Sequence, residues 1–281
     1  MTITLILTFI GMGSVVGLLT AIFGVGGGFL LVPALTAFIG LPFDVATTLS
    51  LCFIIGASLN GLYFKIKLGD FDKKALLYTL PTALIGVICG DIIKDLIKSH
   101  FSEDIAIFNH TMMLVFAVFL IFIASITLHD VFKKTSSHAA LFFRIKPLVR
   151  LSSPIPPVSL ISLLLGGLAV GILSGLLGVG GGLIFLPLLV AGMKLPLNIA
   201  SGTSLGLVFI TALIGITKKG LPDDLHFSLI MLFLLLSGSF IGIKAGITFS
   251  KKQKDTTLKI LLAAILLMVA ISILISELYL I

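Results

Sequence analysis

The chain carries the same glycine-dense motif twice, as GVGGG at residues 24–28 and again at residues 178–182. We call these segments the two glycine motifs. Four glycines in five residues do not hold a helix, so backbone N–H groups there lack helical partners. A helix that starts just after such a break carries partial positive charge at its N-terminus. Together these donors can bind an anion without any charged side chain.

Each motif is expected to end one helix and to precede a half-helix. For the first motif we predict that the helix ends at Phe23 and that the half-helix begins at Phe29. The predicted N–H donors are Gly24, Gly26, Gly27, Gly28, Gly178, Gly180, Gly181 and Gly182. The alternative is that the glycines only let membrane helices pack closely. The motifs are denser in glycine than packing requires, which favours the anion site.

Hydroxyl side chains follow both motifs, in VATTLSL at residues 45–51 and IASGTSL at residues 199–205. The candidates are Thr47, Thr48, Ser50, Ser201, Thr203 and Ser204. Hydroxyl and backbone donors together could replace the water around a small oxyanion. Alternatively, these hydroxyls bond back to the carbonyls of their own helix, as Ser and Thr commonly do in membrane helices.

Few other residues in the apolar segments could do chemistry. Asp91 is the candidate for coupling transport to protons, because intramembrane ionisable groups are functional candidates by default. Its place near the end of an apolar run also allows it simply to reach the membrane surface. The histidines have no metal-ligand spacing, and no nucleotide-binding or hydrolase motif is present. We therefore expect no metal, no cofactor and no enzymatic activity.

The composition indicates a membrane protein, in which spanning helices position the glycine motifs and the hydroxyl side chains. Apolar residues make up 58% of the 281 residues and charged residues only 11%, against about 25% charged in a soluble domain. Charge-free runs predict about eight spanning helices, each needing about 20 residues. The runs 1–43 and 151–193 are too long for one crossing, since straight helices would reach about 65 Å. Both contain a glycine motif, so both are expected to break or re-enter within the membrane.

The sequence is internally duplicated. When it is shifted by 154 residues, 15 of the 35 positions in 17–51 match those in 171–205. We therefore predict an all-α polytopic membrane protein with a transmembrane repeat in 1–128, a basic linker in 129–156 and a second repeat in 157–281. Two homologous halves are common in secondary transporters, whose sites form where the halves meet. Whether the repeats are parallel or inverted stays open.

The loop charges give an expected orientation. With eight alternating crossings, the side that holds both termini has 11 Lys and Arg against 7 on the other. The positive-inside rule then places the termini in the cytoplasm of a multi-pass cell (inner) membrane protein. The margin is small, and the count changes if the glycine-bearing segments change the number of crossings.

The paired motifs, each followed by a proline, an LP dipeptide and a hydroxyl-rich helix start, resemble the TauE/SafE family of sulfite exporters. The second copy, with ASGTSL at residues 200–205, is the more similar; the first has ATTLSL instead. The resemblance implies transport of small sulfur-containing anions, such as sulfite or sulfonates.

These observations favour a secondary transporter that exports a small sulfur-containing oxyanion, sulfite or a sulfonate such as sulfoacetate. Uptake of such anions or of sulfate, an anion channel, and a scaffold without transport are the alternatives. The expected partners are the small anion substrate and the lipid bilayer, with no nucleic acid. Assembly into a homo-oligomer is left open.

Overall fold

The computed structural model describes residues 3–100, 105–132, 147–151, 157–177, 180–193, 195–219 and 225–278. The first half contains five helices: α1 (Ile3–Phe23), α2 (Gly28–Ile39), α3 (Phe43–Lys67), α4 (Lys73–His100) and α5 (Ile105–Phe132). Two short antiparallel strands follow, β1 (Leu148–Val149) and β2 (Val158–Ser159). The second half contains α7 (Leu160–Leu177), α8 (Gly182–Pro187), the π-helical turn η1 (Leu188–Gly192), α9 (Leu197–Lys219), α10 (Leu225–Lys252) and α11 (Asp255–Leu278).

The protein is an all-α polytopic membrane protein, as predicted. Within the described residues, eight helices are long and apolar enough to cross a membrane: α1, α3, α4, α5, α7, α9, α10 and α11. The helix α2 has 12 residues and so spans about 18 Å, roughly half of a bilayer. The α8 and η1 segments together are of similar length.

Both glycine motifs break the chain where the sequence predicted. The helix α1 ends at Phe23, as expected, and the half-helix α2 begins at Gly28, one residue before the predicted Phe29. The equivalent break lies between Leu177 and Gly182. Within it, Gly178 and Val179 lie outside the described residues, so the predicted role of Gly178 is not described by the structure.

The contacts between helices give their relative directions. Gly13 and Gly17 of α1 lie against Leu235 and Ser239 of α10, so these two helices run parallel. Gly86 and Gly90 lie against Leu168 and Ile172, so α4 and α7 are also parallel.

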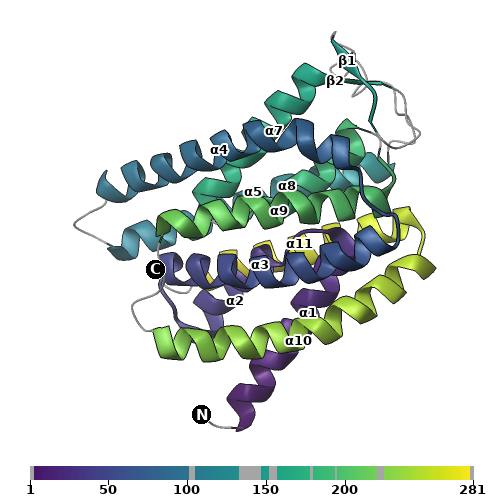
Figure 1. Ribbon diagram of the computed structural model, residues 1–281. Coiled ribbons are helices and arrows are strands. Elements are labelled where there is room, and N and C mark those ends of the chain that lie inside the picture. The colour runs from purple at the N-terminus through teal and green to yellow at the C-terminus, as the bar shows by residue number, and fades with distance from the viewer. Residues whose placement is uncertain are drawn as a thin grey trace.

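The helices α3 and α9, which lie side by side at the centre (Figure 1), run antiparallel. Gly61 near the end of α3 contacts Leu205 near the start of α9, and Gly215 contacts Leu51 in the converse way. The helices α5 and α11 are antiparallel too, since His110 near the start of α5 pairs with Glu277 near the end of α11.

These directions define two faces of the molecule. The linker face contains the α3–α4 turn, the end of α5, the β1–β2 hairpin, the η1–α9 connection and the α10–α11 turn. The terminal face contains the start of α1, the α2–α3 turn, the ends of α4 and α9, and the end of α11. In Figure 1 the hairpin and the C-terminus lie at opposite ends of the molecule.

The helix directions make α1 and α2 a hairpin that enters from the terminal face and returns to it. The segment α7, α8 and η1 makes the corresponding hairpin from the linker face. Each half therefore has a re-entrant hairpin followed by three alternating spans. The two-repeat division stays a prediction, and the packing supports an inverted form of it, because the equivalent helices α3 and α9 run in opposite directions.

Candidate functional site

The first glycine motif adopts a backbone that only glycine adopts readily. Gly24, Gly26 and Gly27 have φ values of +68°, +76° and +85°, in the left-handed region that a Cβ disfavours. Gly180 and Gly181 repeat this in the second motif, with φ of +72° and +71°. The spacing of glycines in both motifs therefore reflects a required backbone path and not packing alone.

The two motifs cross in direct contact. A methyl group on Gly182 would lie 2.1 Å from the carbonyl oxygen of Val25, inside the first motif. A methyl group on Gly24 would lie 2.2 Å from the carbonyl oxygen of Ser201 on α9. Real Cβ atoms do not approach other atoms this closely, so both positions require glycine.

The crossing lies at mid-depth in the bundle. Gly26 and Gly180 both contact the same two buried side chains, Ile54 of α3 and Val208 of α9. Each of these residues lies near the middle of its helix, and the two helices are antiparallel. The motifs therefore meet near the middle of the spanning helices, where the sequence placed the site.

Several backbone N–H groups of the first motif have no backbone acceptor in the part of the chain that the structure describes. Among the described residues, no backbone carbonyl accepts a hydrogen bond from the N–H groups of residues 25–29. The N–H of Gly24 is paired with the carbonyl of Thr20, at 2.8 Å. All five residues are buried, where an N–H group needs a hydrogen-bond partner. An anion at the crossing could supply such a partner.

Four of the six candidate hydroxyls bond within their own helix. Thr47 and Thr48 donate to the carbonyl of Asp44, at 2.9 and 2.8 Å. Ser201 donates to Asn198 and Thr203 to Ile199, and Thr203 also accepts from the N–H of Asp72. A hydroxyl has only one proton to donate, so these four cannot donate to an anion in this state.

The equivalent serines Ser50 and Ser204 differ from each other. Ser204 Oγ donates to the carbonyl of Gly24 at 2.8 Å and approaches that of Gly182 at 3.4 Å, so it ties α9 to both motifs. Ser50 Oγ is fully buried and has no hydrogen-bond partner. Ser50 lies one turn before Ile54, on the helix face that contacts the motifs. Its hydroxyl is therefore the one candidate left free to bind a ligand.

Three further hydroxyl groups lie beside the motifs, and the sequence analysis did not identify them as candidates. Thr211 Oγ1 donates to the carbonyl of Gly180 at 3.1 Å. A methyl group on Gly27 would lie 3.0 Å from Thr20 Oγ1, and one on Gly181 would lie 3.1 Å from Ser174 Oγ. Thr20 and Ser174 are 154 residues apart, so the duplication offset could have revealed this pair.

Asp91 lies further inside the bundle than its position in the sequence suggested. The residue is 8% exposed, and its backbone nitrogen lies against Gly175 in the last turn before the second motif. It takes no part in the ion pairs found among the described residues. One turn along α4, Lys94 is also buried but is paired with Asp44 at 3.2 Å.

A buried lysine and a histidine–glutamate pair also lie away from the crossing. Lys65, at the linker-face end of α3, is 1% exposed and lies 3.9 Å from the carboxylate of Asp70. Near the terminal face, His110 of α5 pairs with the buried Glu277 of α11. Lys65 and Glu277 each have a side-chain partner away from the glycine motifs.

Among the described residues, eight helices are long and apolar enough to cross a membrane, and two glycine-broken hairpins meet at mid-depth. This architecture defines a polytopic membrane protein. Comparison with known proteins agrees, because the family model described as "Sulfite exporter TauE/SafE" matches residues 9–273. The chain belongs to the TauE/SafE sulfite exporter family, and it is a membrane transporter.

The curated relatives carry matching descriptions. A probable membrane transporter protein of Methanocaldococcus jannaschii is 28% identical, with 90% of each chain covered. A probable membrane transporter protein of Haemophilus influenzae is 26% identical, over 96% of this chain and 98% of the relative. No solved structure matches the protein.

Proposed function

We propose that the protein exports a small sulfur-containing oxyanion, sulfite or a sulfonate such as sulfoacetate, by alternating access. The observation that carries this proposal is the buried set of N–H groups in the first glycine motif that have no backbone acceptor among the described residues. The unpartnered hydroxyl of Ser50 lies one turn from Ile54, which contacts the motif. A sulfur oxyanion has several acceptor oxygens and a dispersed charge. Such an anion can accept N–H and O–H donors together without a fixed cation.

The family description supports sulfite as the first substrate to test. The donors at the crossing are uncharged, which fits a ligand that must bind and leave again on each cycle. We expect the motif to favour small anions, and experiment must distinguish sulfite from the sulfonates.

The crossing must open before an anion can reach it. Ile54 and Val208 fill the space between Gly26 and Gly180, so the structure represents a closed state of the proposed cycle. The α1–α2 hairpin returns to the terminal face and the α7–α8 hairpin to the linker face. Rocking one half against the other would open the crossing to one face at a time.

Asp91 is the proposed coupling group. It is buried, lies outside the ion pairs of the described residues, and sits beside the last turn of α7. A carboxylate in this setting can gain and lose a proton as its surroundings open and close. We propose that its protonation is linked to anion movement.

The helix directions also bear on membrane orientation. The expectation of cytoplasmic termini assumed eight alternating crossings. With two re-entrant hairpins, different connecting segments lie on the same face. On the linker face lie the following described cationic residues: Lys65, Lys67, Lys73, Lys74, Arg150, Lys251, Lys252, Lys254 and Lys259. On the terminal face they are Lys94, Lys98, Lys218 and Lys219.

Among the described residues, the linker face therefore has nine Lys and Arg against four on the terminal face. By the positive-inside rule we propose that the linker face is cytoplasmic and that both termini lie outside, in a cell (inner) membrane.

Counterflow in proteoliposomes tests the proposed transport. Vesicles preloaded with unlabelled sulfite should accumulate external labelled sulfite transiently, and the rate should saturate with concentration. Saturable counterflow supports a carrier, whereas flux that neither saturates nor shows counterflow would indicate an anion channel. A monodisperse protein that moves neither sulfite, sulfoacetate nor sulfate would contradict the proposal.

A further inference from the structure

Three charged side chains join α3 to α4 at the terminal face. The carboxylate of Asp44, in the first turn of α3, accepts a hydrogen bond from the Lys94 ammonium at 3.2 Å and a second one from Lys98. We call Asp44, Lys94 and Lys98 the terminal ion cluster. The cluster holds the start of α3 against the end of α4 by charge.

The members of the cluster depend on one another to different degrees. The side chain of Lys94 is 5% exposed and that of Asp44 is 32% exposed, whereas that of Lys98 is 51% exposed. Removing a charged group from water costs free energy, which a partner of opposite charge offsets. The buried Lys94 ammonium therefore needs the Asp44 carboxylate more than the half-exposed Lys98 does.

The packing places α3 and α4 in different parts of the bundle. The helix α4 packs on α7 and α9, with close contacts at Gly86 and Gly206. The helix α3 packs on α10 at Gly56, and α10 packs on α1 at Gly238. Each packed half of the bundle thus contains one helix from the other half of the sequence. The packed halves meet where α3 lies against α9, and the terminal ion cluster joins them again at the terminal face.

The second half of the sequence carries no charge at the equivalent positions. At the offset of 154 residues, Asn198 stands in place of Asp44. At the offset of 152 that relates the glycines of α4 and α10, Gly246 and Ser250 stand in place of the two lysines. These residues lie at the start of α9 and toward the end of α10, on the linker face. The arrangement of the terminal ion cluster is therefore not repeated there.

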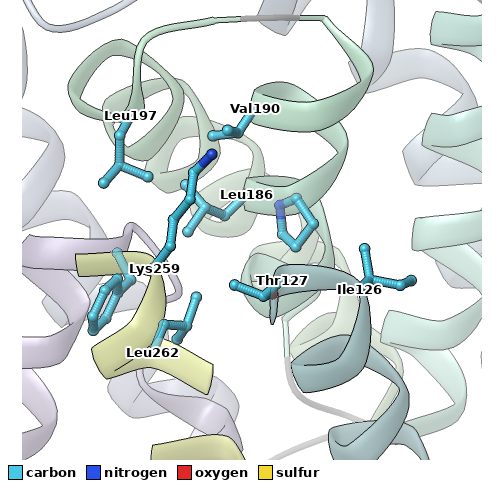
Figure 2. Close-up of a pocket in the computed structure, with 9 residues that line it drawn as sticks. Ile126, Thr127, Leu186, Val190, Leu197, Lys259 and Leu262 are labelled. Atoms are coloured by element: carbon cyan, nitrogen blue, oxygen red, sulfur yellow. The ribbon is translucent and has the colours of Figure 1, made fainter. Parts of the chain in front are cut away.

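The linker side of the crossing is closed mainly by apolar side chains. A cavity of about 20 Å³ lies there, with room for about one water molecule. Its lining is apolar apart from Thr127 and Lys259, and Figure 2 shows Leu186, Val190 and Leu197 beside it. The lining residues of α5, α9 and α11 come from the linker-face ends of those helices. Ion pairs on one side and mostly apolar contacts on the other thus close the two sides differently.

We propose that the terminal ion cluster is the gate that closes the anion pathway at the terminal face, an inference that rests on the proposed transport function. Opening this face separates the packed halves there, so the hydrogen bonds of Lys94 and Lys98 to Asp44 break. Without the Asp44 carboxylate, the buried Lys94 ammonium gains a partner only when water enters, which favours the open state. With the cluster intact, the terminal face stays closed while an anion loads from the linker face, as export requires.

Thiol modification of a cysteine near the crossing tests the gate. Ser50→Cys, in a background without Cys52 and Cys89, is treated with an impermeant thiol reagent in right-side-out and in everted membrane vesicles. Adding Asp44→Asn should raise the rate of modification from the terminal face about tenfold or more, the effect of losing one charged hydrogen bond. The rate from the linker face should not rise.

Asp95→Asn is the matched control for Asp44→Asn. Asp95 follows Lys94 directly on α4, is exposed, and takes no part in the ion pairs found in the described part of the chain. Its substitution removes the same charge from the same face and should leave both rates within about twofold. An equal effect of Asp95→Asn would overturn the gate, because the charge of the whole face would then be responsible. Unchanged rates in Asp44→Asn, or an equal rise from both faces, would overturn it too.

A reversible cross-link provides a second measurement that does not depend on Ser50→Cys. In the background without Cys52 and Cys89, a short bifunctional thiol reagent joins Asp44→Cys to Lys98→Cys. The cross-link should abolish sulfite counterflow and its reduction should restore it, while each single cysteine variant should be insensitive to the reagent. Full counterflow in the cross-linked protein would overturn the gate.

Failure of the gate and failure of the proposed function give different results. Wild-type protein that moves no sulfite, sulfoacetate or sulfate would refute the proposed function. The modification rates of the cysteine near the crossing need no transported substrate, so they still decide whether the terminal ion cluster closes the terminal face.

Discussion

The equivalent serines Ser50 and Ser204 should respond in opposite ways to removal of their hydroxyls. Ser204→Ala removes a buried hydrogen bond of 2.8 Å to the carbonyl of Gly24. Leaving that carbonyl unpaired costs about 1 to 3 kcal/mol. For a chain of this size each kcal/mol corresponds to about 2 to 4 °C. The melting temperature without ligand should therefore fall by about 2 to 12 °C.

Ser50→Ala removes a hydroxyl that has no partner to lose, so the melting temperature without ligand should be unchanged or slightly higher. Its effect should appear when ligand is added. Sulfite at 100 times its dissociation constant should stabilise the wild type by about 2.7 kcal/mol. The Ser50→Ala protein should lose most of this shift, whereas Ser204→Ala should melt lower and still respond to sulfite.

The assay is thermal unfolding of the purified protein in detergent, with and without sulfite, and with chloride at equal ionic strength as the control anion. The reasoning is refuted if Ser50→Ala melts as far below wild type as Ser204→Ala does. That result would assign the Ser50 hydroxyl to a structural bond. A full sulfite shift in Ser50→Ala would remove this hydroxyl from the proposed site.

Three further predictions follow from the packing and the proposed orientation. Gly182→Ala should lower the free energy of unfolding by about 1 to 3 kcal/mol, because its methyl group would lie 2.1 Å from the Val25 carbonyl oxygen. Gly11→Ala is the control, since Gly11 has open space around it, and it should leave stability unchanged. Thermal unfolding of both variants in detergent measures the difference. In a cysteine-free background, Ser99→Cys on the terminal face should react with an impermeant maleimide in intact cells, and Gln253→Cys on the linker face only after permeabilisation; labelling of both alike would contradict the helix directions. Asp91→Asn should abolish the dependence of sulfite flux on an imposed pH gradient while keeping counterflow, and an unchanged dependence would remove Asp91 from coupling.

The glycine breaks could be predicted because they depend on local chemistry. Four glycines within five residues cannot maintain a helix, so the end of α1 at Phe23 followed directly from the sequence. The meeting of the motifs at mid-depth also followed, since an unwound backbone in lipid needs protein or a polar cavity around it. These inferences needed no knowledge of how distant helices are paired.

The helix directions could not be derived in this way. Whether a hydrophobic run of 43 residues crosses once or returns depends on the partner of α1. That partner is α10, more than 200 residues away. The packing of α1 on α10 is secured by Gly13 and Gly17, whose spacing in the sequence indicates close contact but not with which helix.

The different hydrogen-bond partners of the candidate hydroxyls could not be predicted from the sequence either. Ser50 and Ser204 occupy equivalent positions in nearly identical segments, yet one is bonded to a motif and the other is not. Thr47 and Thr203 could be assigned only once their helix carbonyls and the Asp72 N–H were placed.

Asp91 breaks the match between the two halves. It lies along α4 toward the terminal face, and the second half has Ile243 at the offset of 152 that relates Gly86 to Gly238. Under the proposed coupling, a carboxylate would therefore act on one side of the glycine motifs only. Two hairpins with the same glycine spacing would then differ in the charge beside them and not in their backbone.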